Sequence, residues 1–261
     1  MPNLADFGAG TMAWIAVVML VSGFAHGVIG FGFPLIATPL LILAVDLKVA
    51  VVVSLVPTLA LTTLNAFHGG RLRESIGRFW FLPLCLAVGS YVGTRLLIVA
   101  PSEPFLLLLA LVVLGFLNLE RLGRTDAPAI RAHPIPFAVA FGLAAGVFEA
   151  TVNVAGPALL VFFLLLGMQP RPLVQLLNFS FIAGKGVQLA TWTVNGGVTL
   201  AQWLATLPWA LVAGVGLLAG RRVHRRVSTE TYGRWLRSFL WVMAALLLLQ
   251  FAWAMARGPH P

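Results

Sequence analysis

The chain has 261 residues, of which 60% are hydrophobic and 10% are charged, and it carries a formal net charge of +9. A soluble domain carries roughly 25% charged residues, so this composition excludes a soluble protein and predicts a multi-pass protein of the cytoplasmic (inner) cell membrane in contact with lipid. The basic residues lie in short loops between apolar runs and not on one continuous face, so no nucleic-acid partner is expected.

Apolar runs follow one another along the whole chain. They cover residues 11–45, 49–68, 76–99, 104–119, 135–167, 173–194, 200–219 and 235–256. A spanning helix needs roughly 20 residues, so the runs at 11–45 and 135–167 are too long for one helix. Gly and Pro interrupt each of them near its middle. We predict an all-α membrane protein in which these two runs are broken helices or hairpins, with re-entrant hairpins favoured over two full crossings.

The two interruptions occupy equivalent places in a duplicated sequence. The matching residues are Gly23 and Gly27 with Gly142 and Gly146 at an offset of 119, Pro34 with Pro157 at 123, and Gly89, Gly93 and Arg95 with Gly216, Gly220 and Arg222 at 127. This pattern predicts two membrane repeats, 1–130 with a basic connecting loop and 131–261. Each repeat consists of one broken helix or re-entrant hairpin and three transmembrane helices.

Basic residues collect in three loops, and basic loops stay on the cytoplasmic side of a membrane. The loops contain Arg71, Arg73 and Arg78; Arg121, Arg124 and Arg131; and Arg221, Arg222, Arg225 and Arg226. The loops at 100–103 and 195–200 hold no basic residue. Equivalent loops of the two halves therefore fall on opposite sides, so we expect inverted repeats, a recurring plan of secondary transporters.

The two breaks are the first candidates for a binding site. They consist of Gly30, Phe31, Gly32, Phe33 and Pro34, and of Asn153, Val154, Ala155, Gly156 and Pro157. Such a break is tolerated in hydrocarbon only against protein or a watery cavity. A half-helix that starts at the proline also points its N-terminus towards the break, which favours a small anionic substrate. The alternative is that the glycines only permit close helix packing.

Two charged side chains lie within apolar runs. Lys185 is eight or more residues from either end of its run, where an ammonium costs at least about 2.5 kcal/mol. It is a candidate ligand of an anionic substrate, and the alternative is a structural ion pair with Glu149. Glu149 and His26 each precede a break, which makes them candidates for proton coupling. For His26 the alternative is a packing histidine.

Polar side chains are spaced three or four residues apart in two further runs. Ser54, Thr58, Thr62, Thr63 and Asn65 lie in one, and Asn178, Ser180, Gln188 and Thr191 lie in its counterpart. They are predicted to line a substrate pathway, with Ser54, Asn65 and Asn178 as site residues. The alternative is that the hydroxyls bond back to their own helix.

No His, Cys and Glu residues have metal-ligand spacing, and no phosphate-binding loop is present, so neither a metal nor a cofactor is expected. No recognised motif joins a nucleophile to a base, so the chain is not predicted to be an enzyme. The favoured function is a secondary transporter that works by alternating access. The alternative is a channel-like or structural membrane protein, and assembly as a homodimer stays open.

Several segments resemble the sulfite exporter TauE/SafE family of membrane permeases. They are Gly23 to Leu41 (GFAHGVIGFGFPLIATPLL), Lys48-Val49-Ala50 leading to Ser54, and Gly142 to Leu160 with Ala155-Gly156-Pro157. The resemblance covers nearly the whole chain. It implies export or exchange of small, often sulfur-containing anions such as sulfite or organosulfonates, driven by an ion or proton gradient, with a site at the paired breaks. Where many members have a run of glycines, this chain has Phe33-Pro34, and Phe33 is expected to narrow or cap the pocket.

Overall fold

The computed structural model describes residues 7–67, 77–118, 128–168, 170–195, 197–224, 241–242, 244–249 and 251–252. These residues form helices and no strand. Five helical segments of the described chain are long and apolar enough to cross a membrane: Ala9–Ile29, Leu47–Ala66, Gly77–Val99, Pro134–Val152 and Leu200–Val223. The prediction of an all-α protein with several membrane-spanning helices is therefore confirmed.

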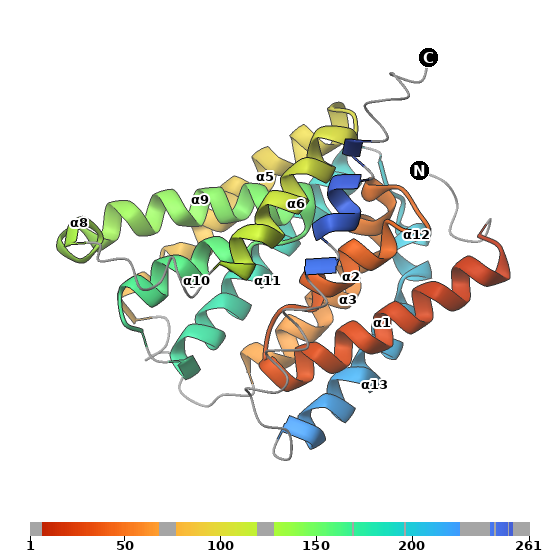
Figure 1. The fold of residues 1–261 in the computed structure, drawn as a ribbon, viewed down its shortest axis with the longest axis horizontal. Coiled ribbons are helices and arrows are strands. Elements are labelled where there is room, and N and C mark those ends of the chain that lie inside the picture. Colours follow the sequence, from red (N-terminus) through yellow and green to blue (C-terminus); the bar gives the residue numbers. More distant parts are fainter. Residues whose placement is uncertain are drawn as a thin grey trace.

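The helices follow the predicted runs closely (Figure 1). The first half contains α1 (Ala9–Ile29), α2 (Phe33–Leu41), α3 (Leu47–Ala66), the short η2 (Gly77–Phe79), α5 (Leu82–Val99) and α6 (Glu103–Leu117). The second half contains α8 (Pro128–Ala132), α9 (Pro134–Val152), α10 (Gly156–Leu165), α11 (Pro170–Val194), α12 (Leu200–Ala205) and α13 (Leu207–His224). The predicted run at 235–256 lies only partly within the described residues.

Both predicted breaks are present. Helix α1 ends at Gly30 with φ 92°, and Gly32, with φ 97°, precedes α2. Helix α9 ends at Asn153 with φ 63°, before α10 begins at Gly156. A residue in the left-handed region cannot continue a right-handed helix, and Gly and Asn adopt that region most readily. Pro34 lies in the first turn of α2, where its missing N–H breaks no helical hydrogen bond.

The two helices of each hairpin differ in length. Helices α1 and α9 have 21 and 19 residues, which gives each a length of about 30 Å at 1.5 Å per residue. Helices α2 and α10 have 9 and 10 residues and reach about half as far. A second full crossing by α2 or α10 would need roughly twice that length. Each hairpin therefore combines one helix of spanning length with a half-length helix.

Two long helix pairs form the frame of the molecule. Helix α1 runs along α13, and α5 runs along α9 (Figure 1). Glycines allow the backbones to touch, because an added Cβ at Gly216 or Gly220 would collide with a carbonyl oxygen of α1, and one at Gly89 or Gly93 with a carbonyl oxygen of α9. Such small residues permit close helix packing in membranes.

The two pairs share one contact register. The carbonyl oxygens that face Gly216, Gly220, Gly89 and Gly93 belong to Leu20, Phe24, Leu143 and Val147, respectively. In both pairs the contacts advance in the same direction along both helices, so each pair is parallel. Leu20 and Phe24 correspond to Leu143 and Val147 at an offset of 123, the same offset that relates Pro34 to Pro157. The helix contacts thus relate α1 to α9 by 123 residues, whereas the matched glycines of the two helices are offset by 119. The difference of four residues is about one helical turn.

Helix α11 lies in the interior and contacts α3, α5, α9 and α10. Its buried polar residues are Gln175, Asn178, Ser180, Lys185, Gln188 and Thr191. These residues make it too polar to be one of the five apolar spans of the described chain. Because neighbouring helices shield it from lipid, its polar face can bond to protein groups instead. The run predicted at 173–194 is thus a helix whose polar residues face the protein interior.

Side-chain hydrogen bonds show which helix ends lie close to each end of α3. At the start of α3, Ser102 donates to Asp46, and the Lys48 ammonium donates to the carbonyl oxygen of Ile98. At the opposite end of α3, Arg221 donates to Asn65. The 100–103 loop and Arg221 therefore lie at opposite ends of the bundle. The basic residues at 71–73, 121–124 and 225–226 lie outside the described residues.

Candidate functional site

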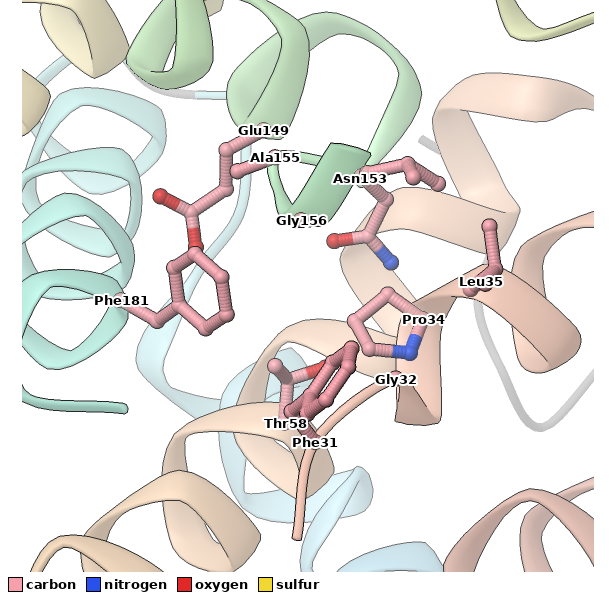
Figure 2. Close-up of a pocket in the computed structure, with 11 residues that line it drawn as sticks. Phe31, Gly32, Pro34, Leu35, Thr58, Glu149, Asn153, Ala155, Gly156 and Phe181 are labelled. Atoms are coloured by element: carbon pink, nitrogen blue, oxygen red, sulfur yellow. The ribbon is translucent and has the colours of Figure 1, made fainter. Parts of the chain in front are cut away.

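A pocket lies between the two breaks (Figure 2). Its lining comes from the first break and the start of α2 (Phe31, Gly32, Pro34 and Leu35), from the second break (Asn153, Val154, Ala155 and Gly156), and from Thr58, Glu149 and Phe181. Seven of the predicted site residues meet here: Phe31, Gly32, Pro34, Glu149, Asn153, Ala155 and Gly156. They are joined by Val154 of the second break and by Thr58, which was predicted to line the pathway. The structure thus brings both breaks to one place, although they are more than a hundred residues apart in the sequence.

Asn153 connects the second break to three helices. Its amide nitrogen Nδ2 donates to Thr38 Oγ1 of α2 at 2.9 Å and to Ser54 Oγ of α3 at 2.7 Å. Its Oδ1 accepts a hydrogen bond from the ammonium of Lys185 on α11. The predicted site residue Ser54 is fully buried and lies behind Asn153, not in the pocket lining. Asn153 therefore fixes the second break to α2 and α3 of the first half.

Lys185 is fully buried, and within the described residues its ammonium bonds only to oxygen atoms of neutral groups. Besides Asn153, it donates to Gln188 Oε1 at 2.8 Å and to the backbone oxygen of Glu149 at 3.5 Å. Gln188 in turn donates to the backbone oxygen of Ala150 at 2.9 Å. None of these contacts is the carboxylate of Glu149. The structure therefore places Lys185 one side chain behind the pocket wall.

Glu149 lines the pocket and is 2% exposed. Its carboxyl group is directed towards Phe181 (Figure 2), and its Oε2 atom has no hydrogen-bond partner among the residues that the structure describes. Gly184 on α11 makes room for this carboxyl, because an added Cβ there would collide with Oε2. A buried polar atom without a partner is uncommon in native proteins and points to a functional role.

His26 caps the start of α2. Its Nδ1 accepts a hydrogen bond from the backbone N–H of Phe33 at 3.3 Å, and its Nε2 is buried with no partner in the described part of the chain. The side chain is 1% exposed and is not part of the pocket lining. This geometry fits the packing alternative for His26, in which the imidazole holds a free N–H of the first break.

The position of Phe33 corrects the expectation that it narrows the pocket. Its side chain is fully buried in an apolar cluster with Ile15, Val18 and Met19, away from the pocket lining. The aromatic walls are Phe31 and Phe181 instead. Phe181 was not predicted, yet it lies four residues before Lys185 on α11, and this spacing puts both on one helix face.

The predicted site residues Gly30, Asn65 and Asn178 do not line the pocket, and the two asparagines bond to the first break at Gly30. The side-chain amides of Asn65 and Asn178 both donate to the backbone oxygen of Gly30, at 3.0 and 2.9 Å. They replace helical partners that this carbonyl lost when α1 ended. The side chain of Pro157, also predicted at the site, lies outside the described part of the structure.

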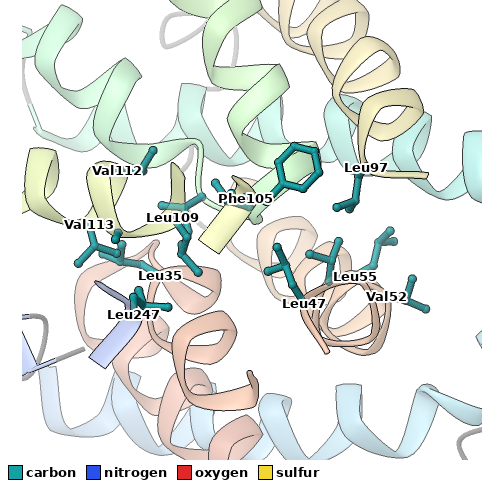
Figure 3. Close-up of a cluster of buried hydrophobic side chains, with 14 of the residues drawn as sticks. Leu35, Leu47, Val52, Leu55, Leu97, Phe105, Leu109, Val112, Val113 and Leu247 are labelled. Atoms are coloured by element: carbon teal, nitrogen blue, oxygen red, sulfur yellow. The ribbon is translucent and has the colours of Figure 1, made fainter. Parts of the chain in front are cut away.

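Apolar side chains back the pocket. Leu35 and Val154 line it and also belong to a larger apolar cluster that includes Leu55, Phe105 and Leu109 (Figure 3). This packing keeps the surroundings of the pocket dry, which strengthens electrostatic interactions inside it. Within the described residues, no group of three or more His, Cys, Asp and Glu side chains could hold a metal ion.

The family model of the sulfite exporter TauE/SafE proteins matches residues 15–249. The chain belongs to this family. The match includes both breaks, α3 and α11, so the pocket lies within the region that defines TauE/SafE proteins. The TauE/SafE family is a class of membrane exporters and not a class of enzymes. No curated protein and no solved structure matches the chain.

Proposed function

We propose that this protein exports small sulfur-containing anions, such as sulfite or organosulfonates, as a secondary transporter driven by an ion or proton gradient. One observation carries the proposal: buried Lys185 is bonded to Asn153 in the wall of a pocket that both breaks line. The Lys185 ammonium bonds to the oxygen atoms of neutral groups, so its positive charge can attract an anion that enters the pocket. Family membership supports the class of substrate.

The second break offers the better seat for the anion. Helix α10 begins at Gly156 in the pocket lining, and the first N–H groups of a helix have no partner within it. At the first break, His26 already accepts from the N–H of Phe33, the first residue of α2, while Pro34 and its counterpart Pro157 both lack an N–H. The anion therefore binds near Ala155 and Gly156, with the charge of Lys185 reaching it through Asn153.

Alternating access follows from the way the halves hold one another. We propose that residues 1–130 and 131–261 are inverted repeats, supported by the common register of the α1–α13 and α5–α9 pairs. The break of each half is bonded to the other half, since Asn153 contacts Thr38 and Asn178 contacts Gly30. A rocking motion of one half against the other then changes access to the pocket.

Counterflow of labelled sulfite into proteoliposomes tests this function. We expect saturable uptake by the wild type and loss of at least nine-tenths of it in Lys185→Met, which keeps side-chain length without the charge. The chain has one other lysine, Lys48, whose ammonium donates to the carbonyl of Ile98 away from the pocket. Lys48→Met is the matched control and should transport at the wild-type rate.

The same samples separate a transport defect from a folding defect. Sulfite that binds only the folded protein raises its apparent thermal stability, and this protection should be present in Lys48→Met and absent in Lys185→Met. Wild-type flux in a well-folded Lys185→Met variant would refute the proposed site. Uptake that rises linearly with sulfite concentration would favour the channel-like alternative.

A further inference from the structure

We propose that the pocket takes up one proton with each anion and that Glu149 receives this proton. The inference rests on the proposed function, because it takes the pocket as the anion site. Two ionisable side chains lie at the pocket: Glu149 lines it, and Lys185 bonds to the lining residue Asn153. Together they carry no net charge when both are ionised.

Few other ionisable groups face Glu149 from the elements that pack on α9. Helix α11 contributes Lys185, and α5 contributes Cys85, which lies beside Gly142 two turns away along α9. Tyr91 and Arg95 of α5 are exposed, and Arg95 donates to Asn195. Glu103 of α6 is exposed, and Arg131 of α8, at the far end of α9, donates to the carbonyl oxygen of Leu165. Helices α2 and α10 contain no ionisable residue, and α3 reaches the pocket with Thr58.

Charge balance requires the proton. In this proposal both groups are ionised before the anion enters, so the anion adds one excess negative charge to a buried region, and an uncompensated buried charge is strongly unfavourable. Protonation of the Glu149 carboxylate removes that excess. The bound anion therefore stabilises the protonated carboxyl group, and by linkage the proton stabilises the bound anion.

Protonation also lets Glu149 donate a hydrogen bond to the anion. An ionised carboxylate can only accept hydrogen bonds, whereas a protonated one carries an O–H donor. Glu149 faces the pocket with a partnerless Oε2 atom. On binding, a proton from water attaches to a carboxylate oxygen of Glu149, and the new O–H donates to an oxygen of the anion. On release, the anion leaves and the proton returns to water on the side to which the pocket then opens.

Anion and proton consequently cross the membrane together, and export is driven by an outward gradient of the anion itself. The loaded and empty pockets have the same net charge, so the flux responds to the pH difference and to the anion gradient, and not to the membrane potential. In proteoliposomes, an imposed pH difference should drive uptake of methanesulfonate, whereas a potential imposed by valinomycin and K⁺ should leave the rate unchanged. Methanesulfonate is the suitable probe because, as the anion of a strong acid, it brings no proton of its own.

Proton uptake by the purified full-length protein tests the inference directly. Methanesulfonate is added in weakly buffered detergent solution with a pH dye, and its affinity is measured in parallel by calorimetry. We expect about one proton per bound anion, and an affinity that falls about tenfold per pH unit across the range in which the proton is taken up. Glu149→Gln keeps a donor in place and should bind methanesulfonate without proton uptake and independently of pH.

Glu103→Gln is the matched control, since Glu103 is an exposed carboxyl outside the pocket, and it should behave as the wild type. Binding of methanesulfonate to the wild type without proton uptake would overturn this inference and leave the proposed function intact. Equal proton uptake by Glu149→Gln would also overturn it. If neither methanesulfonate nor sulfite binds the wild type, the proposed function fails, and this inference fails with it.

Discussion

The two breaks have the same backbone design and different side chains. Gly30 and Asn153 are equivalent at the offset of 123, and both end a helix in the left-handed region, with φ 92° and φ 63°. The first break is held by amides from α3 and α11 that donate to the carbonyl oxygen of Gly30. The second break is held by its own residue Asn153, whose side chain forms hydrogen bonds with α2, α3 and α11.

The same contrast holds one turn earlier. His26 and Glu149 are equivalent at the same offset, and each precedes its break by four residues. His26 is committed to a backbone N–H, whereas Glu149 faces the pocket with an unpartnered oxygen. The contact glycines and the helix lengths are similar in the two halves. In the proposed anion site, the polar groups belong to the second half.

The largest effect should follow from removal of the Asn153 side chain. Asn153→Gly keeps the left-handed backbone and leaves Lys185, Thr38 and Ser54 without their common partner. A buried group left without a partner costs about 1–3 kcal/mol, so transport should fall about a thousandfold, equivalent to roughly 4 kcal/mol. Sulfite counterflow measures the loss.

Its counterpart at the first break is Gly30→Ala. That change strains a residue at φ 92° and places a Cβ 2.9 Å from Val174, so it should lower thermal stability with little change in the affinity for sulfite. If Asn153→Gly transports at the wild-type rate, or if Gly30→Ala alone abolishes sulfite binding, the assignment of the chemistry to the second half is wrong.

The sequence was sufficient for the scaffold because hydropathy, glycine and proline act locally. The apolar runs between residues 11 and 219, the breaks at Gly30–Gly32 and Asn153–Ala155, and the family could all be predicted. The partners of Lys185 could not, because its bonds to Asn153 and Gln188 depend on how α9 meets α11. Phe33 was misplaced for a similar reason: adjacent residues of a helix point in different directions, and only packing decides which one faces a cavity.

The scaffold glycines should respond alike in both halves. Gly89→Ala and Gly216→Ala each place a Cβ against a carbonyl oxygen of the partner helix, so each should destabilise the protein by roughly 3 kcal/mol. Gly115→Ala and Gly214→Ala are matched controls in helices α6 and α13, with nothing within 4 Å of the added Cβ, and should be neutral or slightly stabilising. Thermal unfolding in detergent measures all four, and a large difference between Gly89→Ala and Gly216→Ala would contradict the equivalence of the two helix pairs.

A smaller effect is expected where α11 makes room for Glu149. Gly184→Ala would place a Cβ against Oε2 and turn the carboxyl group away from its position, and we expect about a tenfold loss of transport, or roughly 1.4 kcal/mol. Gly186→Ala lies two residues further along the same helix with nothing within 4 Å of its Cβ, so it controls for helix propensity. Sulfite counterflow compares the two variants, and equal rates would show that the position of the carboxyl group is unimportant.

The smallest effect separates the two equivalent titratable residues. His26→Leu replaces the buried imidazole with an apolar side chain of similar size and leaves the N–H of Phe33 without its acceptor. It should reduce stability by about 1 kcal/mol. Proton uptake with methanesulfonate should stay at the wild-type value, because the imidazole lies outside the pocket lining. Loss of proton uptake in a folded His26→Leu variant would assign proton coupling to the first break. Proton uptake that is retained in His26→Leu and lost in Glu149→Gln would assign the coupling to the second half.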